Sequence, residues 1–238
     1  MNHVIIVAGG TGRRLGLGYN KIFAKLLDRP VLSYTIENFV ASPVIDQIVV
    51  CAGNPQDGTA EMDGQRVREI LEQEDLLERV QVVSGAATRM QSVQCGLDVL
   101  SLEEDHIVLI QDASRPFTSQ SLIEELIEAA QTHGASICGV KPKDTIQRVD
   151  ESGCCVQTYD RETLRAIATP VAVKWGLLRA AREKARKEGY LDTPGFEDSA
   201  LLQQNGVPTY FIDCGYTNIK LTTQEDLFLA ERLLSERV

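Results

Sequence analysis

The sequence predicts a three-layer α/β fold, with a mostly parallel β-sheet covered by helices on both faces. Short runs rich in valine and isoleucine recur at strand length, and such nearly unbroken apolar runs are typical of parallel strands buried on both faces. These runs are residues 4–7, 46–51, 80–83, 107–110 and 136–140. The segments between them have apolar residues three and four positions apart, which predicts helices that alternate with the strands.

The alternation continues almost to the end of the chain. The predicted helices cover residues 31–39, 67–77, 92–100, 119–132, 173–188, 197–205 and 223–236, and a further strand is predicted at 208–212. After about residue 142, two short strands at 144–148 and 154–158 flank the turn sequence DESGCC, which predicts a β-hairpin. Since no linker, repeat or change of composition divides the chain, we expect a single domain over residues 1–238 with a β-arm at about 143–160.

The charge of the chain argues against a nucleic-acid-binding surface. The 238 residues carry a net charge of −10, whereas binding to a phosphate backbone needs a basic field. Any anionic ligand must therefore be held by a local cluster of cations. No segment approaches the roughly 18 consecutive apolar residues of a membrane span, and the N-terminus does not resemble a signal peptide. We expect no nucleic-acid or membrane partner and a cytoplasmic location.

The first strand leads into a glycine-rich loop, AGGTGRRLG, from Ala8 to Gly16. A dinucleotide-binding loop needs the spacing G-x-G-x-x-G, but Leu15 stands where the third glycine belongs. No acidic residue follows the second strand to bind a ribose. The loop instead offers backbone N–H groups that can surround phosphate oxygens, with Arg13, Arg14 and Lys21 as nearby cations. The pattern favours a triphosphate over a dinucleotide.

A second group of polar residues follows the strand at 107–110. Asp112 lies where this strand ends, at the sheet edge where open α/β sheets bind their ligands. A carboxylate there can bind Mg²⁺ while substrate phosphates supply further oxygen ligands. Arg115 can pair with an anionic substrate. The alternative is structural, with Asp112 capping the next helix and Arg115 as its partner.

Several motifs in order resemble those of the 2-C-methyl-D-erythritol 4-phosphate cytidylyltransferase family and of the related ribitol-5-phosphate cytidylyltransferases. They are AGGTGRRLG with Lys21, GAATRMQSVQCGL, QDASRPF, KDTIQRV, TYDRETL, ATP and TNIKLTTQEDLFLAE. The resemblance covers essentially the whole chain, and the ordered set is far more specific than any one motif. It implies a Rossmann-like nucleotidyltransferase fold of the GT-A-like type, and transfer of a cytidylyl group from CTP to a sugar-alcohol phosphate with Mg²⁺ as cofactor.

The resemblance also implies roles for individual residues. Arg14 and Lys21 match cations that stabilise the pentavalent phosphorus, Lys220 matches a catalytic lysine that contacts phosphate, and Asp112 matches the Mg²⁺ ligand. Implied nucleotide contacts are Ala8, Gly9, Gly10, Thr11, Gly12, Ala86, Ser92 and Asp112, and implied contacts of the alcohol phosphate are Arg115, Thr145, Arg161, Thr169 and Lys220. In the family, the threonine and arginine of the hairpin region serve the neighbouring subunit, so a homodimer through the β-arm is implied.

Some positions depart from the family's pattern. Asn20 and Ile22 flank Lys21 where the family usually has proline and glutamine, and Ala86 and Ala87 remove an acidic side chain near the cytosine. Phe196 stands where a threonine that contacts the substrate phosphate is expected. The change at Phe196 leaves the identity of the acceptor open between methylerythritol phosphate, ribitol 5-phosphate and other polyol phosphates, and the change at Ala86 and Ala87 leaves the selection of cytosine open. A different base and a non-catalytic nucleotide-binding protein remain as further alternatives.

Overall fold

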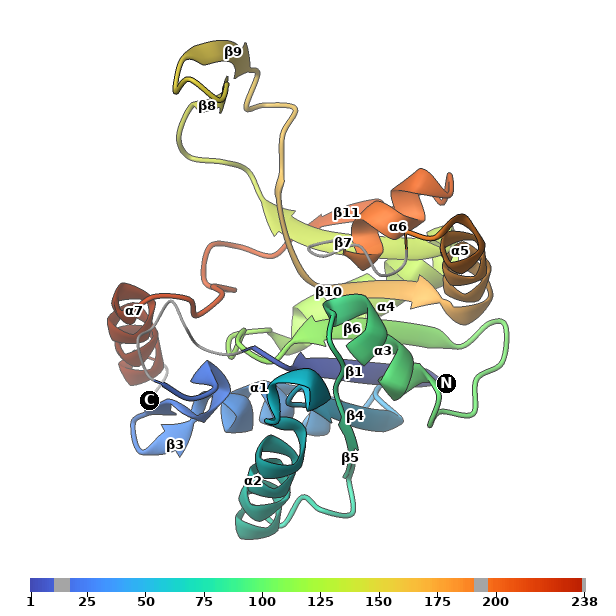
Figure 1. Ribbon diagram of the computed structural model, residues 1–238, viewed down its shortest axis with the longest axis vertical. Coiled ribbons are helices and arrows are strands. Elements are labelled where there is room, and N and C mark those ends of the chain that lie inside the picture. The colour runs from blue at the N-terminus through green and yellow to red at the C-terminus, as the bar shows by residue number, and fades with distance from the viewer. Residues whose placement is uncertain (11–17, 191–196, 237–238) are drawn as a thin grey trace.

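A seven-stranded sheet forms the centre of the protein, in the order β11-β7-β10-β6-β1-β4-β5. The computed structural model describes residues 1–10, 18–190 and 197–236 (Figure 1). The strands of the sheet are β1 (Asn2–Ala8), β4 (Gln47–Ala52), β5 (Val80–Ser84), β6 (Ile107–Asp112), β7 (Ala135–Val140), β10 (Ala166–Lys174) and β11 (Tyr210–Asp213). Strand β10 runs antiparallel to both of its neighbours, and the other neighbouring strands are parallel.

Helices cover both faces of this sheet. They are α1 (Val31–Val40), α2 (Ala60–Gln73), α3 (Arg89–Leu97), α4 (Gln120–His133), α5 (Trp175–Glu188) and α6 (Asp198–Gln204). Helix α7 (Gln224–Ser235) lies apart from the sheet, where it packs with Ala24 and Leu26. Because successive side chains of a strand point to opposite faces, Val4 and Ile6 pack with α1, α2 and α4, whereas Ile5 packs with α3, α5 and α6. The three-layer α/β prediction is confirmed. None of the described helices is long and apolar enough to cross a membrane.

The sequence prediction missed strand β10, which lies between β6 and β7. Residues 168–170 read ATP, and proline within a strand pattern argues against a central strand because it donates no ladder hydrogen bond. The chain accommodates Pro170 at an irregularity, where the register with β7 shifts between Ala168 and Val171. The helix predicted at 173–188 consequently begins later, at Trp175.

Two helices begin earlier than the apolar spacing indicated. Helix α2 begins at Ala60, with a first turn that carries Glu61 and Asp63. Helix α3 begins at Arg89, after a capping box in which the Thr88 hydroxyl accepts from the Gln91 backbone N–H. In both cases a polar first turn extends the helix beyond its apolar stripe: acidic side chains favour the N-terminal end of the dipole of α2, and the Thr88 cap satisfies a free N–H group of α3.

The predicted hairpin is confirmed as β8 (Ile146–Val149) and β9 (Cys155–Tyr159), within one or two residues of its expected bounds. It forms a separate two-stranded sheet that stands away from the rest of the protein, at the top of Figure 1. All four residues of β8 are exposed, as are four of the five in β9. An isolated hairpin of this kind buries almost no apolar surface of its own.

Three short elements follow the glycine-rich loop. They are the 3-10 helix η2 (Lys21–Phe23) and the paired strands β2 (Lys25–Leu26) and β3 (Arg29–Pro30); a further 3-10 helix, η3 (Pro55–Asp57), follows β4. Ala24 and Leu26 pack with Leu221 and with Ala230 of α7 in a small separate hydrophobic cluster. This cluster brings the segment after β1 against the segment before α7.

A buried pair of histidines lies at the opposite end of β1. His3 is fully buried, and its Nε2 lies 3.2 Å from Nδ1 of His106, just before β6. Burial lowers the pKa of His3, and the neighbouring His106 lowers it further. The folded protein therefore resists protonation of His3, while the unfolded chain accepts a proton at an ordinary pKa near 6.5.

We predict that His3 makes the protein less stable at mildly acidic pH. Because the folded-state pKa of His3 lies below its unfolded value, its contribution is complete above the unfolded value and is lost progressively as the pH falls from there through the folded value. Urea unfolding at about pH 7.5 and about pH 5.5 should show a lower free energy of unfolding at the acidic pH. His3→Leu should flatten this dependence, while His133→Gln at the end of α4 should keep it; an unchanged slope in His3→Leu would contradict the assignment.

Candidate active site

A cavity of about 260 Å³ opens where the carboxyl ends of β1 and β6 lie side by side. Its lining combines the ends of these strands with η2, the turn and first residues of α3, and the segment before α7. The lining residues are Val7, Ala8, Gly9, Gly10, Lys21, Ile22, Ala86, Ala87, Thr88, Arg89, Ser92, Asp112, Ser114 and Lys220. Eight predicted site residues, Ala8, Gly9, Gly10, Lys21, Ala86, Ser92, Asp112 and Lys220, are therefore brought together around one cavity.

Asp112 is the last residue of β6, and three cations surround its nearly buried carboxylate. Lys220 Nζ lies 2.6 Å from Oδ2, Arg89 Nε lies 3.4 Å from Oδ1, and Arg115 Nε lies 3.9 Å from Oδ2. Burial alone would raise the pKa of this carboxyl, but Arg89 and Lys220 outweigh it, and the pKa falls to about 2. Asp112 is therefore ionised throughout the neutral range.

The segment that carries Lys220 is held against the strand ends by backbone contacts. The Leu221 N–H donates to the Ser114 carbonyl over 2.9 Å, and Lys21 Nζ donates to the Leu221 carbonyl over 2.8 Å. The small cluster of Ala24, Leu26 and Leu221 fixes the same segment from the other side. Two lysines far apart in the sequence thus lie at one cavity.

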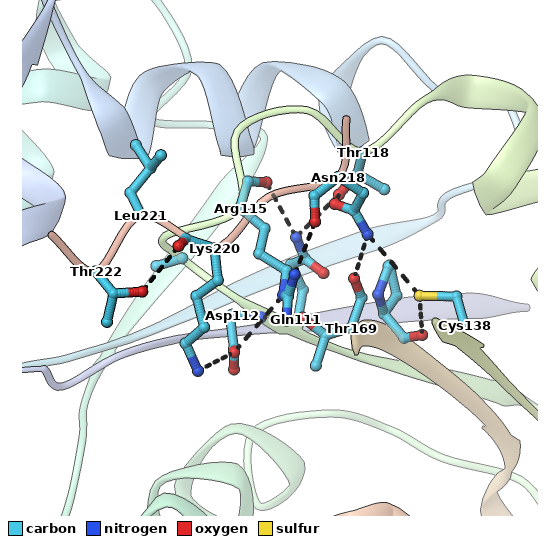
Figure 2. A network of polar contacts seen from close by, with 12 residues as sticks. Gln111, Asp112, Arg115, Thr118, Cys138, Thr169, Asn218, Lys220, Leu221 and Thr222 are labelled. Carbon is cyan, nitrogen blue, oxygen red and sulfur yellow. Dashed lines mark hydrogen bonds and ion pairs between the residues drawn. The ribbon is translucent and has the colours of Figure 1, made fainter. Parts of the chain in front are cut away.

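Arg115 and Thr169 lie behind the cavity lining, in a buried polar network (Figure 2). Arg115 donates from Nη1 to the Asn218 carbonyl over 2.7 Å, and the Asp112 N–H donates to the Thr169 hydroxyl over 3.0 Å. Asn218 Nδ2 completes the network by donating to the Thr169 carbonyl over 3.0 Å. This network ties the end of β6 to β10 and to the Lys220 segment, so it sets the position of Asp112.

Asn20 connects the loop before Lys21 to two other elements. Its side-chain amide donates to the Ala8 carbonyl over 2.7 Å and to the Asp63 carboxylate over 2.9 Å, and its Oδ1 accepts from the Ile22 N–H. Asn20 and Asp63 are both buried, and burial raises the pKa of Asp63. In this chain asparagine therefore holds the start of η2, and with it Lys21, where the family usually has proline.

The turn before α3 closes another side of the cavity. Ser92 Oγ accepts from the Ala86 N–H over 2.9 Å and donates to the Thr88 carbonyl over 3.0 Å. A Cβ at Gly85 would lie 2.3 Å from the Gly53 carbonyl oxygen, so only glycine fits this close approach to the end of β4. The predicted contacts Ala86 and Ser92 thus belong to one rigid turn.

Other predicted residues lie elsewhere. Thr145 precedes β8 and Arg161 follows β9, both exposed on the arm, and Arg161 Nη1 donates to the Lys143 carbonyl over 2.6 Å. Neither lines the cavity of its own chain. Thr11, Gly12, Arg14 and Phe196 lie outside the described residues.

Sequence reasoning placed neither Arg89 nor Asn218 in the site. Arg89 lines the cavity and contacts Asp112, and Asn218 links Arg115 to Thr169. Both residues belong to motifs that carry the family resemblance, GAATR and TNIK, so the sequence marks them as candidates. Their contacts were not, because each joins elements that are separated by many residues along the chain.

The fold and the site define a phosphate-handling class of α/β protein, with an ionised carboxylate, lysines and backbone N–H groups at the carboxyl ends of parallel strands. The family model for IspD, 2-C-methyl-D-erythritol 4-phosphate cytidylyltransferase, matches residues 2–236. The chain belongs to this family of nucleotidyltransferases.

Individual relatives agree with this assignment. The chain is 36% identical over 236 residues to the 2-C-methyl-D-erythritol 4-phosphate cytidylyltransferase of Clostridium acetobutylicum, covering 99% of this chain and 98% of the relative. It is 34% identical to the protein of the same name from Lysinibacillus sphaericus, covering 98% and 96%. The crystal structure of 4-diphosphocytidyl-2C-methyl-D-erythritol synthase from Anaerococcus prevotii superposes with a TM-score of 0.82 at 29% identity, covering 99% and 96%.

We predict that Asn20→Ala lowers the free energy of unfolding by about 1–3 kcal/mol, because the buried Asp63 carboxylate loses its amide donor. Asn54→Ala is the matched control: Asn54 caps η3 in the same way, by accepting from the Gln56 N–H, but has no such buried partner. Its loss should be nearer about 1 kcal/mol.

A double-mutant cycle measured by urea unfolding separates the two effects. In an Asp63→Ala background, Asn20→Ala should cost less than in the wild type, because no buried carboxylate is then left without its donor. Equal losses in the two backgrounds would contradict the proposed link between α2 and the Lys21 segment.

Proposed function

We propose that this protein joins CTP and 2-C-methyl-D-erythritol 4-phosphate to give 4-diphosphocytidyl-2-C-methyl-D-erythritol and pyrophosphate, a step of isoprenoid precursor synthesis by the non-mevalonate route, in the cytoplasm. The observation that carries the proposal is the cavity in which Lys21 and Lys220 lie beside the ionised Asp112. Membership of the family supplies the substrate pair.

The reaction is a displacement at the α-phosphorus of CTP. A phosphate oxygen of the alcohol phosphate forms a new P–O bond, and the bond to the bridging oxygen breaks, so that its electron pair leaves with pyrophosphate. Because several negative charges approach one another, catalysis consists mostly of positioning and charge stabilisation. Lys21 and Arg14 are proposed to stabilise the pentavalent phosphorus, and Lys220 to contact phosphate. Ala8, Gly9, Gly10, Thr11, Gly12, Ala86 and Ser92 are proposed to bind the nucleotide.

Mg²⁺ is the proposed cofactor, with Asp112 as its protein ligand. Among the described residues no group of three His, Cys, Asp or Glu side chains could hold a metal ion. A single ionised carboxylate fits Mg²⁺, which is commonly bound through one or two carboxylates together with substrate phosphates. When bound, the ion would neutralise phosphate charge. Lys220 Nζ pairs with the same carboxylate, 2.6 Å from Oδ2.

The arm supports a homodimer in which each chain completes the site of its partner. Ile146, Val149 and Val156 are exposed on the arm, and a hairpin with so little buried surface needs a second surface to fix its position. We propose that a second copy of the chain supplies that surface, with Thr145 and Arg161 reaching the alcohol phosphate of the neighbouring subunit. Arg115 and Thr169 are proposed to serve the same phosphate within the chain.

Ribitol 5-phosphate is the second candidate acceptor. One feature of the sequence favours it: Phe196 replaces the threonine expected to contact the acceptor phosphate, whereas Ala86 and Ala87 bear on the selection of cytosine. In addition, the nearby Asp198 is fully buried and paired with Arg89 and Arg182, so it offers no free carboxylate to an acceptor.

Pyrophosphate release from CTP with Mg²⁺ tests the function directly. The purified protein is supplied with methylerythritol phosphate, ribitol 5-phosphate and other polyol phosphates. The proposal expects methylerythritol phosphate to have the highest kcat/KM. A higher value for ribitol 5-phosphate would change the acceptor, and saturable CTP binding without turnover on any acceptor would favour a non-catalytic protein.

Removing either proposed phosphate-stabilising cation should abolish most of the turnover. We predict that Lys21→Ala and Arg14→Ala each lower kcat by at least about a thousandfold, as expected when charge stabilisation is lost at a transition state. Lys25→Ala is the matched control, since Lys25 is exposed in the adjacent strand β2. Steady-state pyrophosphate release gives the comparison, and near-normal kcat in Lys21→Ala would refute its role.

Mixed dimers test whether the arm acts in the neighbouring subunit. Arg161→Ala and Lys21→Ala should each be nearly inactive alone, but a hybrid dimer contains one site with both residues intact. Random exchange makes about half of the dimers hybrid, so activity should recover to about a quarter of the wild type. Native mass spectrometry verifies the exchange; no recovery in verified hybrids of two inactive parents would contradict a role of Arg161 in the neighbouring subunit's site.

A further inference from the structure

Arg89 bridges two carboxylates that lie far apart in the sequence, Asp112 and Asp198. Its Nε lies 3.4 Å from Oδ1 of Asp112, and its Nη1 lies 2.5 Å from Oδ2 of Asp198, the first residue of α6. The planar guanidinium can make both contacts at once because its N–H groups point in fixed, separate directions. Arg89 therefore connects the end of β6 to helix α6.

Asp198 is itself fixed from a second direction. Its side chain is fully buried, and Oδ1 accepts from Nη1 of Arg182, in α5, over 3.2 Å. Arg182 is also buried; it donates to the Met90 carbonyl over 2.6 Å and to Gln94 Oε1 over 3.1 Å. Asp198 thus keeps a counter-ion whether or not Arg89 is present, and its position is determined by α3, α5 and α6 together.

The charges of these four side chains balance. Arg89 and Arg182 carry two positive charges, and Asp112 and Asp198 carry two negative charges. Burial would lower the pKa of Arg89, but Asp198 and Asp112 outweigh that effect and raise it, so the guanidinium remains charged. Lys220 and Arg115 are additional cations beside the same carboxylate.

Arg89 and Lys220 differ in how firmly they are held at Asp112. The Lys220 side chain is 37% exposed and presents a single ammonium group on a flexible stem, whereas the Arg89 side chain is 19% exposed and has a second ion pair behind it. A ligand that competes for Oδ2 of Asp112 can displace Lys220 without disturbing the contact of Arg89 with Oδ1. Arg89 is therefore suited to hold Oδ1 of the Asp112 carboxylate while Oδ2 changes its partner.

We propose that Arg89 is a positioning residue, anchored by Asp198, that fixes the Asp112 carboxylate for binding of the nucleotide-bound divalent cation. This inference rests on the proposed CTP and Mg²⁺ site, and it assigns to the arginine of the GAATR motif and to Asp198 a role that acts through Asp112. It also makes the start of α6 a structural support of the metal ligand.

The experiment measures Mn²⁺ binding by electron paramagnetic resonance, with a CTP analogue that carries a methylene group between the α- and β-phosphorus atoms. Arg89→Lys keeps the charge but cannot bridge two carboxylates, and Asp198→Asn keeps the shape of the anchor but removes its charge. Arg179→Lys is the control, because Arg179, on α5, forms exposed ion pairs with Glu183 of the same helix and with Glu104, which precedes β6.

We expect Arg89→Lys and Asp198→Asn to weaken Mn²⁺ binding about 10- to 100-fold, as is typical when a group that orients a metal ligand is lost. Binding of the analogue without metal should stay within about twofold of the wild type in all three variants. In an Asp112→Asn background, Arg89→Lys should have no further effect on Mn²⁺ binding. Excess divalent cation should partly restore kcat in Arg89→Lys, while the KM for the acceptor stays near the wild-type value.

A purely structural role would lower Tm in these variants and leave Mn²⁺ binding unchanged, and that result would overturn the proposal. If Arg89→Lys does not fold, Asp198→Asn decides the question in the same way, since it leaves Arg89 in place. Failure of the proposed function is distinguishable: the wild type would then release no pyrophosphate with any acceptor, whatever the Mn²⁺ affinities of the variants.

Discussion

The site depends on one carboxylate that remains ionised although it is almost buried. Desolvation alone would push the pKa of Asp112 upward, and a protonated Asp112 would offer neither a metal ligand nor a counter-ion for Lys220. Arg89, Lys220 and Arg115 reverse this effect, and each comes from a different part of the chain. The fold around the strand ends can be understood as the structure needed to bring these cations to a single residue.

Two packing features meet that requirement. The first is the small hydrophobic cluster around Leu26 and Leu221, which holds the Lys21 and Lys220 segments together across 200 residues of sequence. The second is the buried network through Thr169 and Asn218, which fixes the backbone at Asp112 from the side of β10. Because the hydrophobic cluster and the polar network are both built from buried groups, they hold the cations close to one another despite their mutual repulsion. Three of these cations, Lys21, Arg89 and Lys220, line the cavity.

Much of this organisation is visible in the sequence, and the missing parts have physical causes. Apolar runs identified six strands of the sheet, and the glycine-rich loop with Lys21 and Asp112 located the cavity, because strand ends and small-residue turns leave local patterns. Strand β10 was missed because a proline, Pro170, interrupts its sequence pattern. The irregularity that accommodates Pro170 arises only when β10 pairs with β7, which the sequence does not show. The ion pairs of Arg89 with Asp112 and Asp198 span 23 and 109 residues, so no local pattern records them. The catalytic role of Arg14 and the contact assigned to Arg161 remain predictions from the resemblance.

On binding the nucleotide, we expect Asp112 to exchange Lys220 for the nucleotide-bound metal ion while Arg89 stays in place. A crystal structure with CTP and Mg²⁺ tests it most directly. We expect the ion on Asp112 and the triphosphate between Gly10 and Lys21, with Lys220 Nζ moved from Asp112 to a phosphate oxygen and both ion pairs of Arg89 retained. A triphosphate bound elsewhere, or Lys220 still paired with Asp112 in the loaded site, would contradict it.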